Sequence, residues 1–153
     1  MEPPTSDASA DRDEPRAGSV QGGVLRAAGV SYLSIPAPDP PRSAAFYRAV
    51  FGWQVGGGAD RPSFQDGTGH VIGHFIRDLA VAGAAGVQPY VYVDSIDDTL
   101  AKLAAEGAEL VREPYPEGDL WVATFHDPGG NVIGVWQQGP RRSPRTVAGT
   151  PQR

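Results

Sequence analysis

The sequence predicts an α+β fold made of two βαβββ modules, whose strands form a curved mixed eight-stranded sheet with both helices on its outer face. Two segments look alike, because in each a β-rich run leads into a helical pattern that ends at a glycine. Asp39 and Asp94 are 55 residues apart, as are Gly52 and Gly107, which indicates a duplicated module. The chain also has 20 glycines and 15 prolines among 153 residues, which argues against a helical bundle.

The folded unit is expected to span residues 24–138 as one domain, with modules at about 24–77 and 87–138. Residues 1–23 are acidic and residues 139–153 are basic. Because both ends are poor in large apolar side chains, we expect two disordered tails. The connection between the modules is predicted at Asp78–Gly86, which is rich in small residues.

Charge and composition exclude several classes of function. Residues 24–138 hold 13 acidic and 7 basic side chains, and an acidic body does not favour a nucleic-acid partner. No run approaches the roughly 18 apolar residues of a membrane span, and the N-terminus lacks the apolar segment of a signal peptide. We therefore expect a cytoplasmic protein with no membrane partner. The lack of cysteine excludes disulfides and thiolate nucleophiles.

Two helices are expected, each bounded by residues typical of helix ends. Asp39 is a suitable N-cap for the first, prolines follow at 40 and 41, and Gly52 ends it. The second begins near Ser95 and ends at Gly107. Apolar residues recur at helical spacing in both, at Phe46, Ala49, Val50 and Trp53 and at Ile96, Leu100, Leu103 and Ala104.

Short strands are expected before and after each helix. The first and fifth strands precede the helices at Val30–Pro36 and Val87–Val93. The others are predicted at Trp53–Val55, Pro62–Gln65, His70–Arg77, Glu109–Arg112, Leu120–His126 and Val132–Gln137. The Asp-Pro-Gly-Gly-Asn run at 127–131 predicts a turn between the last two strands.

Alternation along the strands assigns side chains to two faces, since successive side chains point to opposite sides. The predicted helix-packing face holds Leu33, Ile35, Val91, Val93, Ile133 and Val135. The other face carries aromatic rings, hydroxyls and an amide, as small-molecule sites do. Its candidate ligand-binding residues are Tyr32, Ser34, Phe75, Gln88, Tyr90, Tyr92, Trp121 and Trp136, of which Trp121 lies on a strand whose face is left open. The alternative interpretation is that these aromatics fill a second core or a dimer interface.

Tyr32 and His74 are the candidate catalytic residues, because phenol and imidazole groups can move a proton on an enolisable carbonyl compound. Strand parity groups Gly73 and Phe75 with the ligand-facing set and so turns His74 toward the helices. The three histidines of the chain also allow a three-histidine metal site, against the simpler interpretation of surface histidines at strand ends.

Two motifs give the chain a family resemblance. One is FYRAVFGW at 46–53, preceded by Ile-Pro at 35–36, and the other is FHDPGGNVIGVWQ at 125–137. With them the chain resembles the vicinal oxygen chelate superfamily, which includes glyoxalase I, bleomycin-resistance proteins and extradiol dioxygenases, and within it the glyoxalase-like branch. The resemblance covers about 24–138 and implies paired βαβββ modules, a ligand site in the cupped sheet and a homodimer.

The resemblance also implies where a metal would bind. In metal-using members, four His, Gln or Glu ligands come from the first and last strands of both modules and hold a divalent ion. Those positions fall on Tyr32, Gly73, Gln88 and Gly134 in this chain. Because glycine offers no side-chain donor and tyrosine is a poor ligand for these metals, no metal or other cofactor is expected.

Two functions follow as hypotheses. The first is a metal-independent binding protein of the bleomycin-resistance type, which holds an aromatic or apolar metabolite or drug in the cupped sheet. The alternative is a lyase, isomerase or dioxygenase-type enzyme that acts on an enolisable or vicinal-oxygen substrate. The acidic body favours a cationic ligand in the first case.

Overall fold

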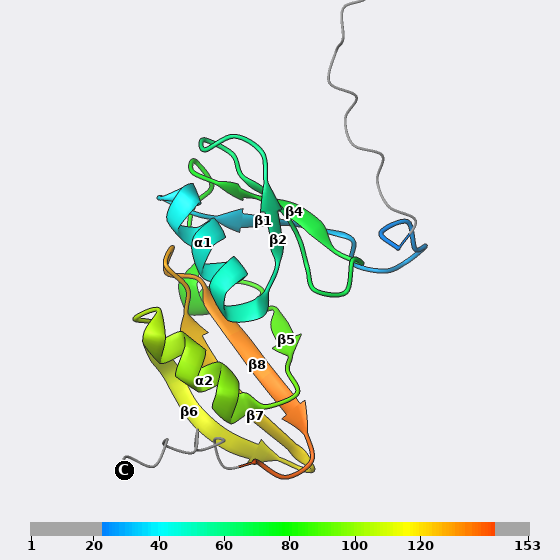
Figure 1. Cartoon of the computed structure of the whole chain (residues 1–153), viewed down its shortest axis with the longest axis vertical. Helices are drawn as coiled ribbons and strands as arrows, with labels where there is room; N and C mark the ends of the chain where they lie inside the picture. The colour runs from blue at the N-terminus through cyan, green and yellow to red at the C-terminus, as the bar shows by residue number, and fades with distance from the viewer. Residues whose placement is uncertain (1–22, 143–153) are drawn as a thin grey trace, which may run out of the picture.

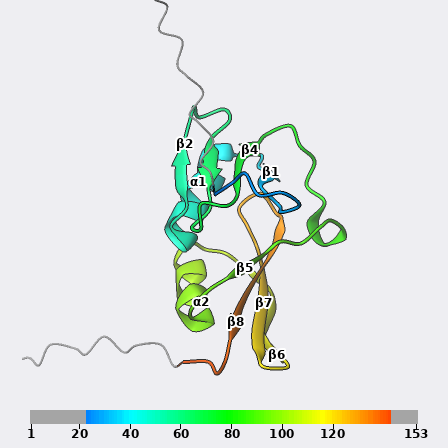
Figure 2. The same cartoon turned by 90° about the vertical axis from the view of Figure 1, so that its right-hand side faces the viewer.

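The computed structural model describes residues 23–142, which form two βαβββ modules in succession (Figure 1). The first module consists of β1 (Tyr32–Pro36), α1 (Pro40–Phe51), β2 (Gln54–Gly56), β3 (Ser63–Gln65) and β4 (Ile72–Ile76). The second consists of β5 (Tyr90–Tyr92), α2 (Ile96–Ala105), β6 (Leu110–Glu117), β7 (Leu120–His126) and β8 (Val132–Gln138). A short 3-10 helix, η1 (Gly83–Ala85), lies in the connection, which loops away from both modules in Figure 2.

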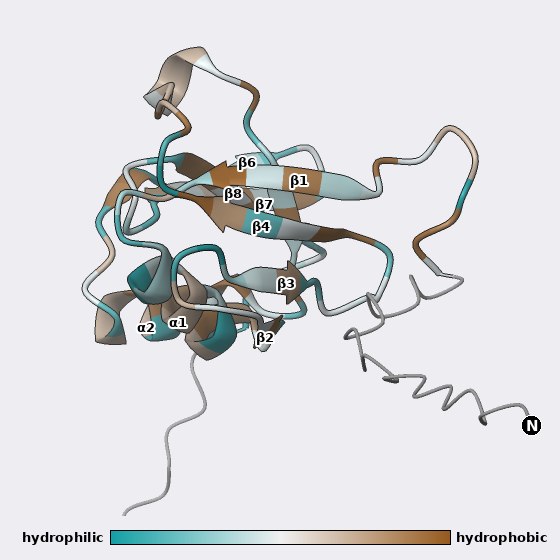
Figure 3. Ribbon diagram, turned by 90° about the horizontal axis from the view of Figure 1, so that it is seen from above, coloured by the Kyte–Doolittle hydropathy of each residue, from teal (hydrophilic) through white to brown (hydrophobic). Residues whose placement is uncertain are grey.

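Each module has its own mixed four-stranded sheet. The strand orders are β1-β4-β3-β2 and β5-β8-β7-β6, so the two modules share one topology. β1 is parallel to β4 and β5 is parallel to β8, whereas the other pairs are antiparallel. The helices α1 and α2 lie side by side beneath β1, β4 and β8 (Figure 3). The predicted α+β class with paired modules is confirmed, and the eight strands are divided between two sheets.

Both helices begin and end where their capping residues predict. The Asp39 carboxylate accepts a hydrogen bond from the Arg42 backbone N–H at 3.3 Å, and Gly52 ends α1 in the left-handed conformation with φ of 68°. Ser95 Oγ accepts from the Asp98 N–H at 3.1 Å and so caps α2. Helix capping is a local interaction, which is why sequence alone locates it.

β6 is longer than predicted. It continues to Glu117, although the prediction ended this strand at Arg112, and it includes prolines at 114 and 116. β6 is the edge strand of its sheet, where a missing proline N–H costs no ladder bond. Its pairing with β7 shifts register twice, on either side of Arg112, so the strand also bends.

The core lies between the sheets and the helices and draws on both modules. Its largest fully buried side chains include Tyr47, Phe75, Phe125, Ile96, Leu103 and Val135. Two hydrogen bonds also join the modules. Tyr47 Oη donates to Asp127 Oδ2 at 2.8 Å, and Asn131 Nδ2 donates to the Pro36 carbonyl at 2.7 Å. The turn at 127–131 therefore fastens the second module to α1 and β1.

The predicted tails fall mostly outside the described residues, which exclude 1–22 and 143–153. The first part of the predicted basic tail is described and contacts the second module. Arg141 forms an ion pair with Asp97 on α2, and its guanidinium lies over the Trp121 ring at 5.2 Å from the centroid. The interactions that hold the chain against α2 thus continue past residue 138.

Candidate ligand-binding site

The sheets have one face that no helix covers, formed by alternate side chains of β1, β4, β5, β8, β7 and β6. We call it the helix-free face. Strand register assigns its members, because directly paired residues point to the same side of a sheet. In the first module Tyr32 pairs with Ile72, and Ser34 pairs with His74. In the second, Tyr90 pairs with Gly134 and Tyr92 pairs with Trp136.

The structure brings together the two candidate catalytic residues. Tyr32 Oη and His74 Nδ1 are 2.6 Å apart, within hydrogen-bond distance, and their ring centroids are 5.9 Å apart. Burial lowers the pKa of His74 from its ordinary value, and the positive charge of Arg61 lowers it further. A neutral imidazole that accepts the Tyr32 hydrogen at Nδ1 carries its own proton on Nε2. The pair thus offers one phenol and one imidazole N–H to a ligand on this face.

The prediction that His74 faces the helices, and Phe75 the ligand, is wrong by one residue. The parallel register of β1 and β4 pairs Ile35 with Phe75, so Phe75 belongs to the core face. Phe75 is 0% exposed and its ring lies 5.4 Å from that of Tyr47. Residues 71–76 carry apolar side chains at both parities, so alternation alone cannot assign the faces of β4.

Gly73 also belongs to the core face, where it permits close packing. A Cβ at this position would lie 2.0 Å from the Leu33 carbonyl oxygen and 2.5 Å from the Phe64 ring. The absence of a side chain at 73 therefore makes space for Phe64 and for β1, not for a ligand.

In the second module the helix-free face is aromatic. Tyr92 and Trp136 meet edge to face with centroids 4.9 Å apart. The Tyr90 ring occupies the space that a side chain at 134 would need, since a Cβ on Gly134 would lie 2.1 Å from Tyr90 Cδ1. Partial burial raises the pKa of Tyr90, with further contributions from Tyr115 and Glu117. Its hydroxyl therefore stays protonated at neutral pH and can donate.

Arg112 and Tyr115 of β6 belong to this face and were missed by sequence reasoning. Arg112 pairs with Thr124, and Tyr115 pairs with Val122, so both point to the same side as Tyr90 and Trp136. The Arg112 guanidinium lies 3.4 Å from the centroid of the Tyr115 ring. The register shifts of β6 interrupt its alternation, so no parity count along the sequence could place them.

Two further candidates lie elsewhere. Trp121 pairs with Gln137, on the opposite side of β7 from the helix-free face, and packs against the core. Gln88 precedes β5, and its Nε2 donates to the Ala84 carbonyl at 3.2 Å, so it belongs to the connection between modules. The predicted site residues on the helix-free face are therefore Tyr32, Ser34, His74, Tyr90, Tyr92 and Trp136.

Comparison with known proteins gives the family. A family model described as "Glyoxalase-like domain" matches residues 32–136, which is more than half of the chain. The chain belongs to the glyoxalase-like family. The motifs at 46–53 and 125–137 predicted this glyoxalase-like branch, and the family match confirms it.

Curated relatives match at low identity. The "Putative glyoxylase CFP32" of Mycobacterium tuberculosis is 25% identical over 117 residues, which are 70% of this chain and 44% of that protein. The chain thus spans less than half the length of the curated relatives that it matches.

Solved structures share the fold of this glyoxalase-like domain. A glyoxalase/bleomycin resistance protein/dioxygenase family enzyme from Burkholderia phytofirmans is 22% identical with a TM-score of 0.61, covering 71% of this chain and 97% of that chain. The fosfomycin resistance protein FosX from Listeria monocytogenes is 14% identical with a TM-score of 0.63, covering 73% and 94%. TioX from Micromonospora is 20% identical with a TM-score of 0.56, covering 72% and 98%. At these identities the likeness concerns the fold alone.

The glyoxalase-like domain does not fit the four-ligand metal site that the superfamily implies. Gly73 faces the core, Gln88 is held by the connection, and any glutamate at 134 would collide with the Tyr90 ring. The remaining position, Tyr32, has its hydroxyl against His74. Among residues 23–142, no group of three or more histidine, cysteine or acidic side chains could hold a metal ion, and no helix is long and apolar enough to cross a membrane.

Proposed function

We propose that the protein binds a small aromatic or apolar molecule on the helix-free face and that no metal ion takes part. The observation that carries this proposal is the exposure of Tyr32, Tyr90 and Tyr92, which are 44%, 45% and 52% exposed on one face. Tyrosine rings offer flat apolar surface for stacking, and their hydroxyls orient a ligand. His74 and Ser34 add polar groups beside Tyr32.

The proposal includes a second copy of the chain. In one copy a ligand on the helix-free face has protein on only one side, whereas small-molecule sites usually bury most of the ligand surface. A partner that brings its own helix-free face opposite would supply the second wall. This arrangement reconciles the two interpretations of the exposed aromatics, because a dimer interface and a ligand site then share the same side chains.

Native mass spectrometry of the full, untagged chain tests this function. We expect a dimer that carries an organic adduct and no metal ion. The Tyr92→Ala variant should lose the adduct, whereas Leu25→Ala, which truncates a still more exposed apolar side chain elsewhere, should keep it. One metal ion on each chain would contradict the proposal, and so would an adduct that Tyr92→Ala retains in full.

A second candidate function is metal-free proton transfer on an enolisable substrate, as in a lyase or isomerase. The 2.6 Å contact between Tyr32 Oη and His74 Nδ1 favours it, because paired donor and acceptor groups are what acid–base catalysis requires. Tyr32→Phe removes the hydroxyl and keeps the ring. If the protein is such an enzyme, this variant should bind the ligand and lose turnover. Unchanged turnover would reject a catalytic role for Tyr32.

A further inference from the structure

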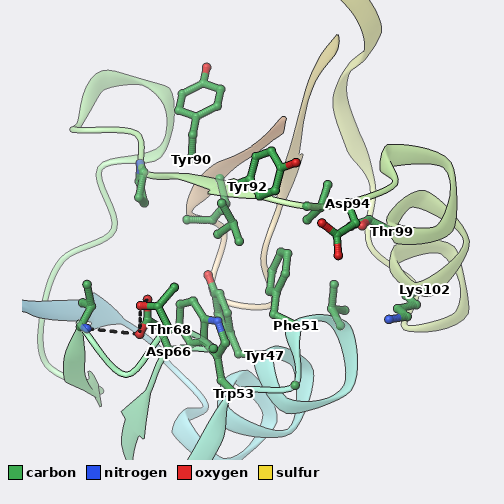
Figure 4. Close-up of a pocket in the computed structure, with 18 of the residues that line it drawn as sticks. Tyr47, Phe51, Trp53, Asp66, Thr68, Tyr90, Tyr92, Asp94, Thr99 and Lys102 are labelled. Carbon is green, nitrogen blue, oxygen red and sulfur yellow. Dashed lines mark hydrogen bonds between the residues drawn. The ribbon is translucent and has the colours of Figure 1, made fainter. Parts of the chain in front are cut away.

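A second candidate site lies on the opposite side of β5 from the helix-free face. It is a cavity of about 780 Å³ between the two modules, which we call the inter-module cavity (Figure 4). Its walls come from the end of α1, from β5 and the start of α2, and from the turn between β3 and β4. This volume lies within the roughly 300–1,000 Å³ of small-molecule sites.

The walls of the inter-module cavity are mainly apolar. Tyr47, Phe51 and Trp53 form one side, with Trp53 stacked on Tyr47 at 4.7 Å and Phe51 6.0 Å from Trp53 between centroids. Val91 of β5 and Val93, just after it, form the other side, because alternation turns them away from the helix-free face. In Figure 4 the three rings lie beneath β5 while Tyr90 points away from them. The cavity therefore presents apolar side chains from both modules.

Both ends of the cavity carry carboxylates. Asp66 and Asp94 lie on opposite sides of the three rings in Figure 4, and Asp98 lies farther along α2. Lys102 is the only basic side chain among the lining residues, so the rim carries a net negative charge. A rim of this sign beside an apolar wall favours a ligand with a positive charge.

The carboxylates of Asp66 and Asp94 differ in the hydrogen bonds that they already accept. Asp66 accepts hydrogen bonds from Thr68 Oγ1 at 2.9 Å and from the backbone N–H groups of His70 and Val71 at 3.1 and 3.2 Å. Within residues 23–142, no hydrogen bond or ion pair engages the Asp94 carboxylate. Asp66 therefore serves to shape the turn, and Asp94 is the group with free acceptor capacity for a ligand.

We infer that the inter-module cavity binds a flat organic cation, an aromatic or apolar body that bears an ammonium group. The body lies between the Phe51 ring and the side chains of Val91 and Val93, and the ammonium group lies at the Asp94 end. Trp53 contributes its edge, because Tyr47 and Phe64 stack on its two faces. This site is separate from the one proposed on the helix-free face. It shares β5 with that face, since Tyr90 and Tyr92 also border the cavity, and its other walls come from α1, α2 and the turn between β3 and β4 of the same chain.

Two probes of equal shape and different charge test the inference on the full chain by isothermal titration calorimetry. Phenyltrimethylammonium carries a positive charge, and tert-butylbenzene is its neutral counterpart. We expect the cation to bind about tenfold more tightly than the neutral probe, because the Asp94 carboxylate attracts only the charged probe. Equal affinities would refute the choice of a cation, and failure of both probes to bind would refute the site.

Variants then locate the binding. Asp94→Asn should weaken the cation about fivefold and leave the neutral probe unchanged. Asp119→Asn makes the same change of charge on the exposed turn between β6 and β7 and should alter neither affinity. Val91→Phe fills the cavity and should abolish both, whereas Val111→Phe, at an exposed position of β6, should not. Cation binding that Asp94→Asn leaves intact would overturn the inference even if Val91→Phe does not fold.

Discussion

The hydrogen bond between Tyr47 and Asp127 gives the sharpest test of how the two modules are held together. Tyr47 is 1% exposed, and its hydroxyl donates across the module boundary to Asp127 Oδ2 at 2.8 Å. Tyr47→Phe removes this bond and keeps the ring that packs on Trp53. Asp127 still accepts from the N–H groups of Gly129 and Asn131 and from the Asn131 side chain, so its carboxylate is not left unpaired.

The expected cost is therefore that of one hydrogen bond to a charged group, about 2 kcal/mol. With a urea dependence of about 2 kcal/mol per molar, the midpoint of unfolding should fall by about 1 M. Urea titrations followed by tryptophan fluorescence and by circular dichroism measure it. Tyr92→Phe removes a hydroxyl from an exposed ring and should change the midpoint little.

Alkaline pH supplies an independent signature of the same bond. Burial raises the pKa of Tyr47 well above its ordinary value, and the negative charge of Asp127 raises it further. Above about pH 10 the unfolded chain releases this proton while the folded chain keeps it, so the wild type loses stability as pH rises. The difference in free energy of unfolding between the wild type and Tyr47→Phe should then decrease by about 1.4 kcal/mol per pH unit. A midpoint shift below about 0.25 M, or a difference that does not depend on pH, would refute the reasoning.

Three other predictions follow from the packing, the capping and the titration of single residues. Gly73→Ala should destabilise the fold by about 3 kcal/mol, because its Cβ would meet the Leu33 carbonyl, whereas Gly58→Ala should be nearly neutral in the same chemical denaturation, since nothing lies near its added Cβ. Ser95→Ala should cost about 1 kcal/mol by removing the N-cap of α2, and restoration by Ser95→Asp would distinguish capping from packing. The pKa of His74 is lowered in the folded state, so acidification below about pH 6.5 should destabilise the wild type more than His74→Gln. Thermal unfolding measured across this pH range tests the expectation, and an equal loss of stability in both proteins would contradict it.

The fold was predictable from the sequence because its signals are local. Asp39, Gly52, Ser95 and Gly107 mark helix ends through interactions with backbone groups a few residues away. The shared 55-residue offset between Asp39 and Asp94 and between Gly52 and Gly107 then indicated two equivalent modules.

The candidate site was predictable only where alternation is clean. Along β5, polar aromatic and apolar residues alternate, so Tyr90 and Tyr92 could be assigned to one face. β4 is apolar at both parities, and β6 shifts register, so neither strand could be assigned. The contact between Tyr32 and His74 depends on a parallel register between residues 42 positions apart, which no local pattern encodes.

The three-residue strand β5 lies between the helix-free face and the inter-module cavity. The Tyr90 and Tyr92 side chains extend over the helix-free face, and those of Val91 and Val93 line the inter-module cavity. The pairing of β5 with β8 fixes these orientations. A substitution at position 90 or 92 therefore changes the side chains of the helix-free face. A substitution at position 91 or 93 changes the apolar wall of the inter-module cavity. A single-residue insertion before Tyr90 would instead exchange the two surfaces at once, with hydroxyls turned inward and valines outward.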